Sequence, residues 1–263
     1  MLIVIKGAGD LATGVACRLK NVGFDVAMLE TQCPTTVRRT VAFSPCVYTG
    51  EQVVEGIKAC LAKDANEAKA IIKNGDIAVL VDPEAKSIKE LKPDAIVDAI
   101  IAKFNVGTAI TDAPIVVALG PGFTAGEDCH CVVETQRGHN LGRCIYSGKA
   151  AENTGIPGNI AGYTTERILR APCDGTFEPL NEIGDIVKKG QVVARVNGED
   201  LLSNLDGIVR GMLQKGVKVH KGMKSGDVDP RGVEEYCLTV SDKGRAIAGG
   251  VLEAIMHLSW GDK

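Results

Sequence analysis

Apolar and polar positions follow two patterns along the first 120 residues. Short, continuous apolar runs predict buried strands, because a strand covered on both faces needs no polar side. Between these runs, apolar residues recur at steps of three and four, which is the spacing of one helix face. The runs predict strands over 2–5, 24–29, 77–81, 95–100 and 115–119, and the helical spacing predicts helices over 11–22, 51–62, 65–73 and 84–91.

Strands that alternate with helices predict a mostly parallel sheet with helices on both faces. We therefore expect an α/β protein whose residues 1–165 form a Rossmann-like, nucleotide- or cofactor-binding domain. Residues 40–48, which contain a proline, are expected to be extended chain.

An internal repeat begins after this domain. Residues 173–190 match residues 205–222, with Asp-Gly, a central Gly, Val and Lys-Gly in register. Each half is typical of short strands joined by glycine turns, and two such halves predict one small shared core. The repeat resembles the barrel-sandwich hybrid of biotinyl and lipoyl carrier domains, so residues 166–237 are expected to be a small all-β domain. The connecting stretch 195–204 holds no lysine, which argues against a carrier and leaves a scaffold or docking module.

Two features close the chain. Asp227, Asp229 and Arg231 form either a site or an ion-paired turn, and the turn is favoured. From Ser241, a good N-cap residue, apolar residues at helical spacing predict a C-terminal helix. We expect the region 238–263 to pack back on the first domain.

Composition narrows the function classes. The 263 residues are 45% apolar and 24% charged, as in globular proteins, and the net charge of −3 argues against nucleic acid as a partner. No apolar run approaches the roughly 20 residues of a membrane span. No basic, cleavable leader is visible, so a cytoplasmic protein without a membrane partner is expected.

Nine cysteines without a CxxC pair favour reduced thiols over a disulfide framework. The stretch Cys129-His130-Cys131 invites a metal interpretation. On a strand, however, the two cysteines would face away from His130, and no further ligand pair lies nearby. Structural cysteines are favoured and no metal site is expected. His130 stays a candidate for catalysis or binding, and no catalytic residue is assigned.

A glycine turn between the first strand and helix is the main candidate site. Gly7, Gly9 and Ala12 match the G-x-G-x-x-A dinucleotide fingerprint, and the helix N-terminus that follows would attract an anion. Asp10, Leu11 and Gly14 complete the stretch, and Glu30 ends the second strand where an acid would meet a ribose hydroxyl. The alternative is a similar fold whose glycines serve packing.

Further binding candidates follow other predicted strands. Arg38 and Arg39 would hold a phosphate or form an exposed basic pair. Gly120 and Gly122 form a second glycine loop expected at the same sheet edge, or an ordinary turn. The polar segment 136–162 is expected to be either a binding surface or an exposed linker, with Arg137, His139 and Arg143 as its candidate ligands for an anion.

Together these motifs are similar to the YqeB family, the selenium-dependent molybdenum hydroxylase system proteins of bacteria. The resemblance covers nearly the whole chain and is carried by residues 7–14, 36–43, 120–126, 134–139, 155–158 and the Asp-Gly repeat. The N-terminal part is also distantly similar to the XdhC/CoxI proteins, which handle molybdenum cofactor. The resemblance implies an accessory protein that matures or inserts molybdenum cofactor, binds molybdopterin or its nucleotide form, and works with a molybdenum hydroxylase or its maturation proteins.

Two other functions stay open. An NAD(P)-dependent oxidoreductase is one, although Glu30 favours NAD, the arginine pair favours NADP, and no Tyr-x-x-x-Lys pair is present. A non-enzymatic docking protein that uses the repeat is the other. The sequence decides neither whether the chain is an enzyme nor whether it forms a homo-oligomer.

Overall fold

The computed structural model describes residues 1–260, and the chain divides into two compact units. The first unit contains residues 1–34, 42–154 and the chain from 240 onward. The second contains residues 35–41 and 155–239, so its first segment is separated from the rest by residues 42–154. The end of the predicted C-terminal region, 261–263, lies outside the described residues.

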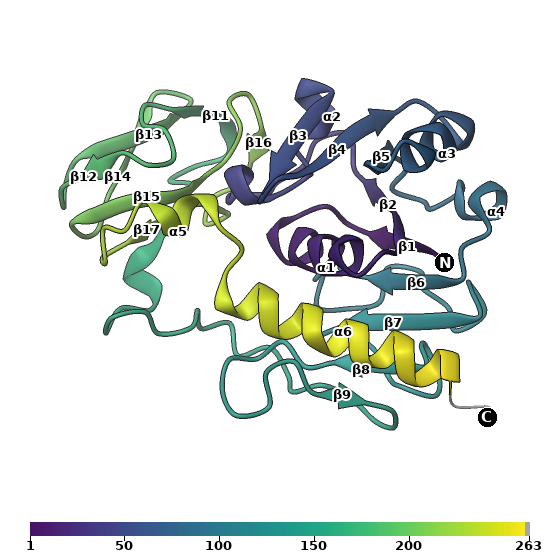
Figure 1. The fold of residues 1–263 in the computed structure, drawn as a ribbon. Helices are drawn as coiled ribbons and strands as arrows, with labels where there is room; N and C mark the ends of the chain where they lie inside the picture. The colour runs from purple at the N-terminus through teal and green to yellow at the C-terminus, as the bar shows by residue number, and fades with distance from the viewer. Residues whose placement is uncertain (261–263) are drawn as a thin grey trace. The chain divides into compact units, whose positions relative to one another are not determined.

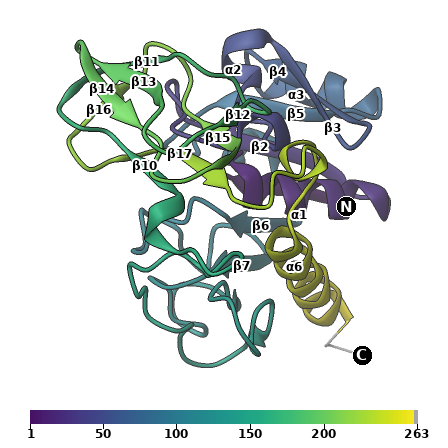
Figure 2. The ribbon, with the colours of Figure 1, turned by 90° about the vertical axis from the view of Figure 1, so that its left-hand side faces the viewer.

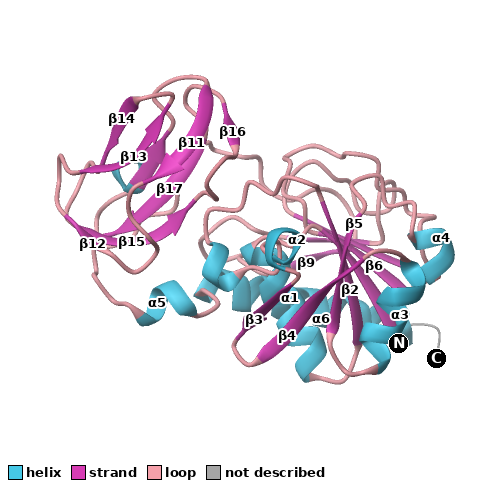
Figure 3. Cartoon of the chain, turned by 90° about the horizontal axis from the view of Figure 1, so that it is seen from above, coloured by secondary structure: helices cyan, strands magenta, loops and turns pink. Residues whose placement is uncertain are grey.

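A nine-stranded sheet forms the centre of the first unit, in the order β3-β4-β5-β2-β1-β6-β7-β8-β9 (Figure 1). The strands from β4 to β8 in this spatial order run parallel, whereas β3 and β9 pair antiparallel at the two edges. Figure 3 shows the twisted fan that these strands make. Their bounds are β1 Leu2–Lys6, β2 Asp25–Glu30, β3 Glu51–Val54, β4 Ile57–Ala62, β5 Ile77–Val81, β6 Ala95–Asp98, β7 Ile115–Leu119, β8 Cys131–Val133 and β9 Cys144–Ile145.

Helices bury the apolar faces of this sheet. Helix α3 (Ala65–Lys73) packs on β2, β4 and β5 and contacts the short helix α4 (Ile88–Leu91). Its first turn is capped by Asp64, whose carboxylate accepts the N–H of Glu67 at 2.9 Å. Helices α1 (Asp10–Asn21) and α6 (Asp242–Trp260) pack against each other, and α6 also contacts β7, β8 and β9 (Figure 1). Ser241 accepts the N–H of Gly244 and so caps α6. No helix among residues 1–260 is long and apolar enough to cross a bilayer.

Two local predictions were wrong for reasons of turn chemistry. Residues 51–62 form the hairpin β3–β4 and not a helix, because Glu55 and Gly56 both adopt positive φ, 49° and 79°, and close a two-residue turn. The segment expected to be extended holds the 3₁₀ turn η1 (Arg39–Val41) and helix α2 (Cys46–Thr49). The five apolar runs are confirmed as β1, β2, β5, β6 and β7.

Two four-stranded antiparallel sheets form the second unit, in the orders β10-β17-β15-β12 and β14-β13-β11-β16. Phe177, Val196 and Met212 are fully buried in its core. The fold prediction is therefore corrected in both parts. The large sheet is mixed and not Rossmann-like parallel, and the small domain consists of two antiparallel sheets in place of the expected carrier-domain hybrid. The bounds are η2 Thr165–Arg167, β10 Ile168–Arg170, β11 Gly175–Pro179, β12 Ile186–Val187, β13 Val192–Val196, β14 Glu199–Leu202, β15 Gly207–Met212, β16 Lys218–Val219, β17 Lys224–Asp229 and α5 Glu235–Leu238.

The sequence repeat is visible as a reciprocal pair of hydrogen bonds. Asp174 of the first half accepts the backbone N–H of Lys221 at 2.7 Å, and Asp206 of the second half accepts that of Lys189 at 2.8 Å. The equivalent aspartate of each half thus binds the Lys-Gly turn of the other. Each Asp-Gly motif is used to join the halves, which accounts for its recurrence in the sequence.

Candidate functional site

Three loops at the carboxyl ends of β1, β6 and β7 form the candidate site of the first unit. An added Cβ at Gly7 would lie 3.0 Å from the carbonyl oxygen of Ala99, and one at Gly122 would lie 2.6 Å from the Cα of Phe104. Both glycines also have positive φ, 96° and 109°. The segment 99–104 therefore contacts both predicted glycine loops. In open α/β sheets, ligands bind at this edge, next to the strand where the order reverses.

A buried polar chain anchors the segment that follows β6. The Lys6 amine donates to the Thr108 hydroxyl at 2.8 Å and to the Asp112 carboxylate at 3.0 Å. The Thr108 hydroxyl donates to Asp98 at 2.6 Å. Burial raises the pKa of Asp98, although its hydrogen bonds oppose that change. Since Lys6 ends β1 and Asp98 ends β6, the network ties the loop to the two strands at the centre of the edge.

Lys103 is the residue of this edge that sequence reasoning missed. It adopts a positive φ of 71°, and the β-branched Ile101 two residues earlier has a φ of 60°. Such conformations are strained for these residues and persist only where the surroundings hold them. The Lys103 side chain is exposed, yet desolvation by neighbouring protein atoms lowers its pKa, and no carboxylate of residues 1–260 contributes to the shift. Its only sequence signal is a lysine just beyond a buried strand.

The carboxylate of Glu30 stabilises the first glycine turn through a hydrogen bond to its backbone. Glu30 accepts the N–H of Ala8 at 3.0 Å with one oxygen and that of Thr31 at 2.7 Å with the other. The acid expected to meet a ribose hydroxyl is thus engaged with the backbone of the turn. Gly9 is the N-cap of α1, and Asp10 and Leu11 begin the helix, whose first N–H groups have no partner within the helix.

Gly14 and Gly120 lie against other protein atoms. A Cβ at Gly14 would be 3.0 Å from Val240 and 3.4 Å from Gly244, so this glycine permits the close approach of α1 and α6. At Gly120, the side chain of Thr135 occupies the space that a Cβ would need. Both positions therefore have a packing role.

The predicted ligands of the polar loop are on the surface. Arg137 forms a bidentate ion pair with Asp242, at 2.6 and 2.8 Å, in the first turn of α6. His139 and Arg143 are exposed. His130 lies just before β8, and its Nδ1 accepts the backbone N–H of Val116 at 3.0 Å. Among residues 1–260, no group of three His, Cys, Asp or Glu side chains could hold a metal ion.

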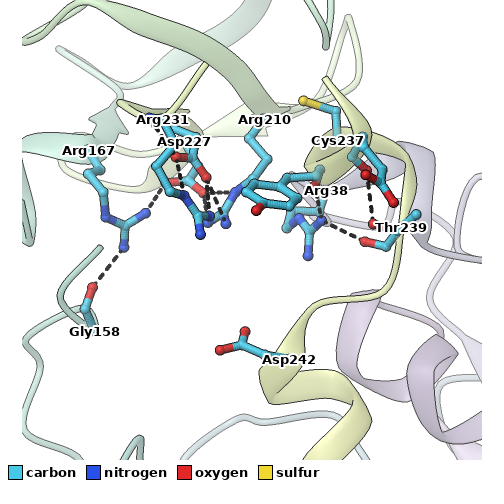
Figure 4. Close-up of polar contacts among 12 residues, drawn as sticks. Arg38, Gly158, Arg167, Arg210, Asp227, Arg231, Cys237, Thr239 and Asp242 are labelled. Atoms are coloured by element: carbon cyan, nitrogen blue, oxygen red, sulfur yellow. Dashed lines mark hydrogen bonds and ion pairs between the residues drawn. The ribbon is translucent and has the colours of Figure 1, made fainter. Parts of the chain in front are cut away.

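Arg38 and Arg39 are placed in the second unit by the structure. Arg38 is buried and donates to the carbonyl oxygens of Tyr236 at 2.8 Å and Thr239 at 3.2 Å (Figure 4). Arg39 donates to the carbonyl of Met212 at 2.7 Å. Both arginines thus attach the segment 35–41 to the rest of its unit, in contrast to the expected place beside the second strand.

A network of arginines and aspartates lies beside Arg38 in the same unit (Figure 4). Asp227 receives Arg167 at 2.6 Å and the Nε of Arg210 at 2.9 Å, with a second, shorter contact from Arg210. Asp229 receives Arg231 at 2.6 and 2.9 Å and Arg210 at 3.3 Å. The Arg231 interactions are the main opposition to burial and lower the pKa of Asp229.

The network connects separate segments of the second unit. Asp227 and Asp229 are alternate residues of β17, so their side chains share one face of the sheet. Arg167 comes from η2 and Arg210 from β15, while the Arg231 guanidinium stacks on the Tyr236 ring at 4.4 Å. The favoured interpretation of an ion-paired turn is therefore extended to a buried network that joins four segments.

The chain is similar to the uncharacterized protein YqeB of Escherichia coli (strain K12), with 53% identity over 257 residues. The match includes 98% of this chain and 48% of YqeB, so the chain spans about half the length of this curated relative. The expected resemblance to YqeB is confirmed at this level. No family model matches the chain. Nothing found supports the XdhC/CoxI likeness.

Solved structures give only distant likenesses. An aspartoacylase family protein from Mesorhizobium loti is 13% identical, with 86% of this chain and 84% of that chain covered and a TM-score of 0.29. A succinylglutamate desuccinylase from Silicibacter has the same identity and coverage and a TM-score of 0.26. The ectoine utilization protein EutE from Ruegeria pomeroyi is 11% identical over 86% of this chain and 52% of that chain, with a TM-score of 0.23. These TM-scores are too low for a fold or an activity to be assigned to this chain from these proteins.

The functional prediction is corrected. None of these proteins is named as a molybdenum cofactor maturation protein or an NAD(P) oxidoreductase. The geometry gives a physical reason as well. Glu30 is bound to the turn it was expected to complete, and Arg38 and Arg39 bind carbonyl groups of the second unit.

Proposed function

We propose that the first unit binds a small anionic molecule at the carboxyl edge of β1, β6 and β7, with Lys103 as its cation. The observation that carries the proposal is the position of Lys103 in the strained segment 99–104, which packs against both glycine loops at this edge. Desolvation lowers the pKa of the Lys103 amine, which means that the protein stabilises the charged amine less than water does. A bound anion would supply the missing stabilisation, so the positive charge and the ligand favour each other.

The backbone around Lys103 supports a preorganised site. Two residues of its loop have strained positive φ values, and the backbone of Lys103 and Phe104 lies against Gly122, where a side chain would not fit. The loop is also anchored through Thr108 to β1 and β6. A cation held in a fixed position binds at a smaller entropic cost than one on a mobile loop.

Backbone N–H groups at the start of α1 would also contribute to binding the anion. Gly9 begins the twelve-residue helix α1, and the first N–H groups of a helix, together with its dipole, favour a negative charge. Glu30 places a carboxylate at the N–H of Ala8, and a bound anion would be repelled by that carboxylate. The ligand's charge should therefore lie toward the helix and Lys103 and away from Glu30.

Inorganic phosphate is a suitable first probe, titrated into the full chain and followed by amide chemical shifts, with sodium chloride as the ionic-strength control. We expect shifts centred on the loops after β1, β6 and β7. Lys103→Met should weaken binding about tenfold, the effect of losing roughly 1.4 kcal/mol from a charge-assisted contact.

Lys73 provides a matched control. It is an exposed lysine in the last turn of α3, which leads into the amino end of β5 at Ile77, the opposite edge of the sheet. Lys73→Met should leave phosphate binding unchanged. Equal effects of the two substitutions, or shifts spread over the whole surface, would contradict the proposal.

A further inference from the structure

We propose that Cys131 and Cys144 form a dithiol that peroxides oxidise to an intramolecular disulfide. The pair lies at the edge of the large sheet, where β8 meets β9 in antiparallel register. This inference does not depend on the anion site, because it uses different side chains and a different edge of the sheet.

Strand register brings the two thiols to one face. Val133 lies directly opposite Cys144, and Cys131 is two residues from Val133, so Cys131 and Cys144 are diagonal neighbours on the same face. The two thiols lie close enough to influence each other's pKa. Diagonal neighbours are somewhat farther apart than a disulfide prefers, so closure needs a small backbone adjustment. Strand β9 has two residues and is an edge strand, which makes such an adjustment easy.

The two cysteines differ in their exposure to solvent. Cys131 is fully buried, whereas Cys144 is partly exposed beside the 38% exposed Tyr146. The ring of Tyr146 contacts that of His257 at a centroid distance of 4.6 Å. Cys144 also lies 3.0 Å from the carbonyl oxygen of Gly250. A small polar oxidant can therefore approach Cys144 first.

The two thiols shift each other's pKa in opposite directions. The neighbouring Cys144 thiol lowers the pKa of Cys131, and the Cys131 thiol, together with burial, raises the pKa of Cys144. After one proton is lost, the pair holds one proton between two sulfurs. The remaining proton favours Cys144, so Cys144 reacts through the minor form in which that proton lies on Cys131 and Cys144 is the nucleophilic thiolate.

The reaction balances with hydrogen peroxide as the oxidant. The Cys144 thiolate attacks one peroxide oxygen, the O–O bond breaks, and a sulfenic acid forms while the released hydroxide takes up a proton as water. The Cys131 sulfur then attacks the sulfenic sulfur, the S–O bond breaks, and the second oxygen leaves as water with the remaining proton. Two thiols are oxidised to one disulfide and one peroxide is reduced to two waters.

Formation of the disulfide would restrict the loop between β8 and β9. Residues 134–143 connect β8 to β9 and carry Arg137 and His139. A disulfide between Cys131 and Cys144 would join the two ends of this loop covalently. We therefore expect slower amide hydrogen exchange in residues 134–143 after oxidation.

The test is peroxide treatment of the full chain, followed by intact mass measurement and peptide mapping without reduction. We expect the loss of two hydrogen atoms and a cross-link between the peptides that contain Cys131 and Cys144. Cys144→Ser should abolish the cross-link. Cys129→Ser, which changes another buried thiol two residues before Cys131, should retain it.

A second measurement leaves both cysteines of the pair unchanged. It uses the Cys33→Ser chain, because the exposed Cys33 would compete for the oxidant. Brief peroxide treatment of this chain in the presence of dimedone should label Cys144 as the sulfenic acid before any other thiol of β8 and β9. Oxidation that stops at Cys144 as a sulfinic acid, or a disulfide that uses another cysteine, would overturn the proposal.

Discussion

Two adjacent glycines of α6 give a stringent test of the packing described for the first unit. Gly249 and Gly250 both lie in the interior of the helix. A Cβ at Gly249 would meet nothing within 4 Å, whereas one at Gly250 would lie 2.9 Å from the Cγ1 of Val133 and still nearer to the carbonyl oxygen of Gly142. The substitutions Gly249→Ala and Gly250→Ala therefore differ in packing and in nothing else of consequence.

The magnitude follows from these contacts. Replacing a helical glycine by alanine stabilises the helix by about 1 kcal/mol at either position, so this contribution cancels between the variants. Carbon atoms pack best at about 3.5 Å or more, so the new methyl group at Gly250 is at least about 0.6 Å too close to Val133. Overpacking of this kind costs about 1–3 kcal/mol. We expect Gly250→Ala to be less stable than Gly249→Ala by about that amount.

Urea unfolding followed by tryptophan fluorescence is the appropriate assay. The single tryptophan of the sequence, Trp260, ends α6 and therefore reports on this helix. Gly249→Ala should raise the urea midpoint above that of the parent chain, and Gly250→Ala should lower it relative to Gly249→Ala at an unchanged slope. Equal midpoints for the two variants would refute the close approach of α6 to Gly142 and Val133.

Three further predictions concern other interactions of the fold. Asp227→Asn should destabilise the second unit by about 3–5 kcal/mol in urea unfolding, because the buried Arg167 and the largely buried Arg210 would both lose this carboxylate. Asp64→Ala should cost about 1 kcal/mol of stability through loss of the α3 cap, measured as a lower urea midpoint. Burial raises the pKa of the Cys17 thiol from 9.0 to about 12. The protonated thiol therefore contributes to folding stability below pH 9, and this contribution is lost as the pH rises toward 12. The free energy of unfolding of Cys17→Ala should fall less over this pH interval than that of the parent chain.

The sequence predicted the elements whose signals are local. Continuous apolar runs located the central strands, because burial on both faces leaves no polar position in them. Helical spacing failed over residues 51–62, since Val53, Val54 and Ile57 satisfy the spacing of a helix as well as that of a hairpin. The Glu55-Gly56 turn decided the outcome.

Long-range features were out of reach of the same reasoning. Nothing local in residues 35–41 indicates that they join a unit built mainly from residues 155–239. Arg38 and Arg39 were therefore assigned to the wrong surroundings. Gly14 matched a binding fingerprint. Its lack of a side chain, however, allows α6, which lies more than two hundred residues later in the chain, to pack closely against α1.

The candidate site of the first unit was likewise predicted only where its signals are local. The glycine loops at Gly7 and Gly122 were recognised from their sequences, but the segment 99–104 that contacts both was not. Lys103 has no motif around it. Its pKa and its left-handed backbone arise from tertiary surroundings, which a single sequence does not display.

The measurement that tests the proposed anion site most directly is the pKa of the Lys103 amine, followed by NMR with and without inorganic phosphate. In the free chain we expect this pKa to lie below that of an ordinary lysine, because desolvation disfavours the charged form. Phosphate should raise it, since an adjacent anion favours the charged amine. An ordinary pKa that phosphate does not change would contradict the proposed role of Lys103.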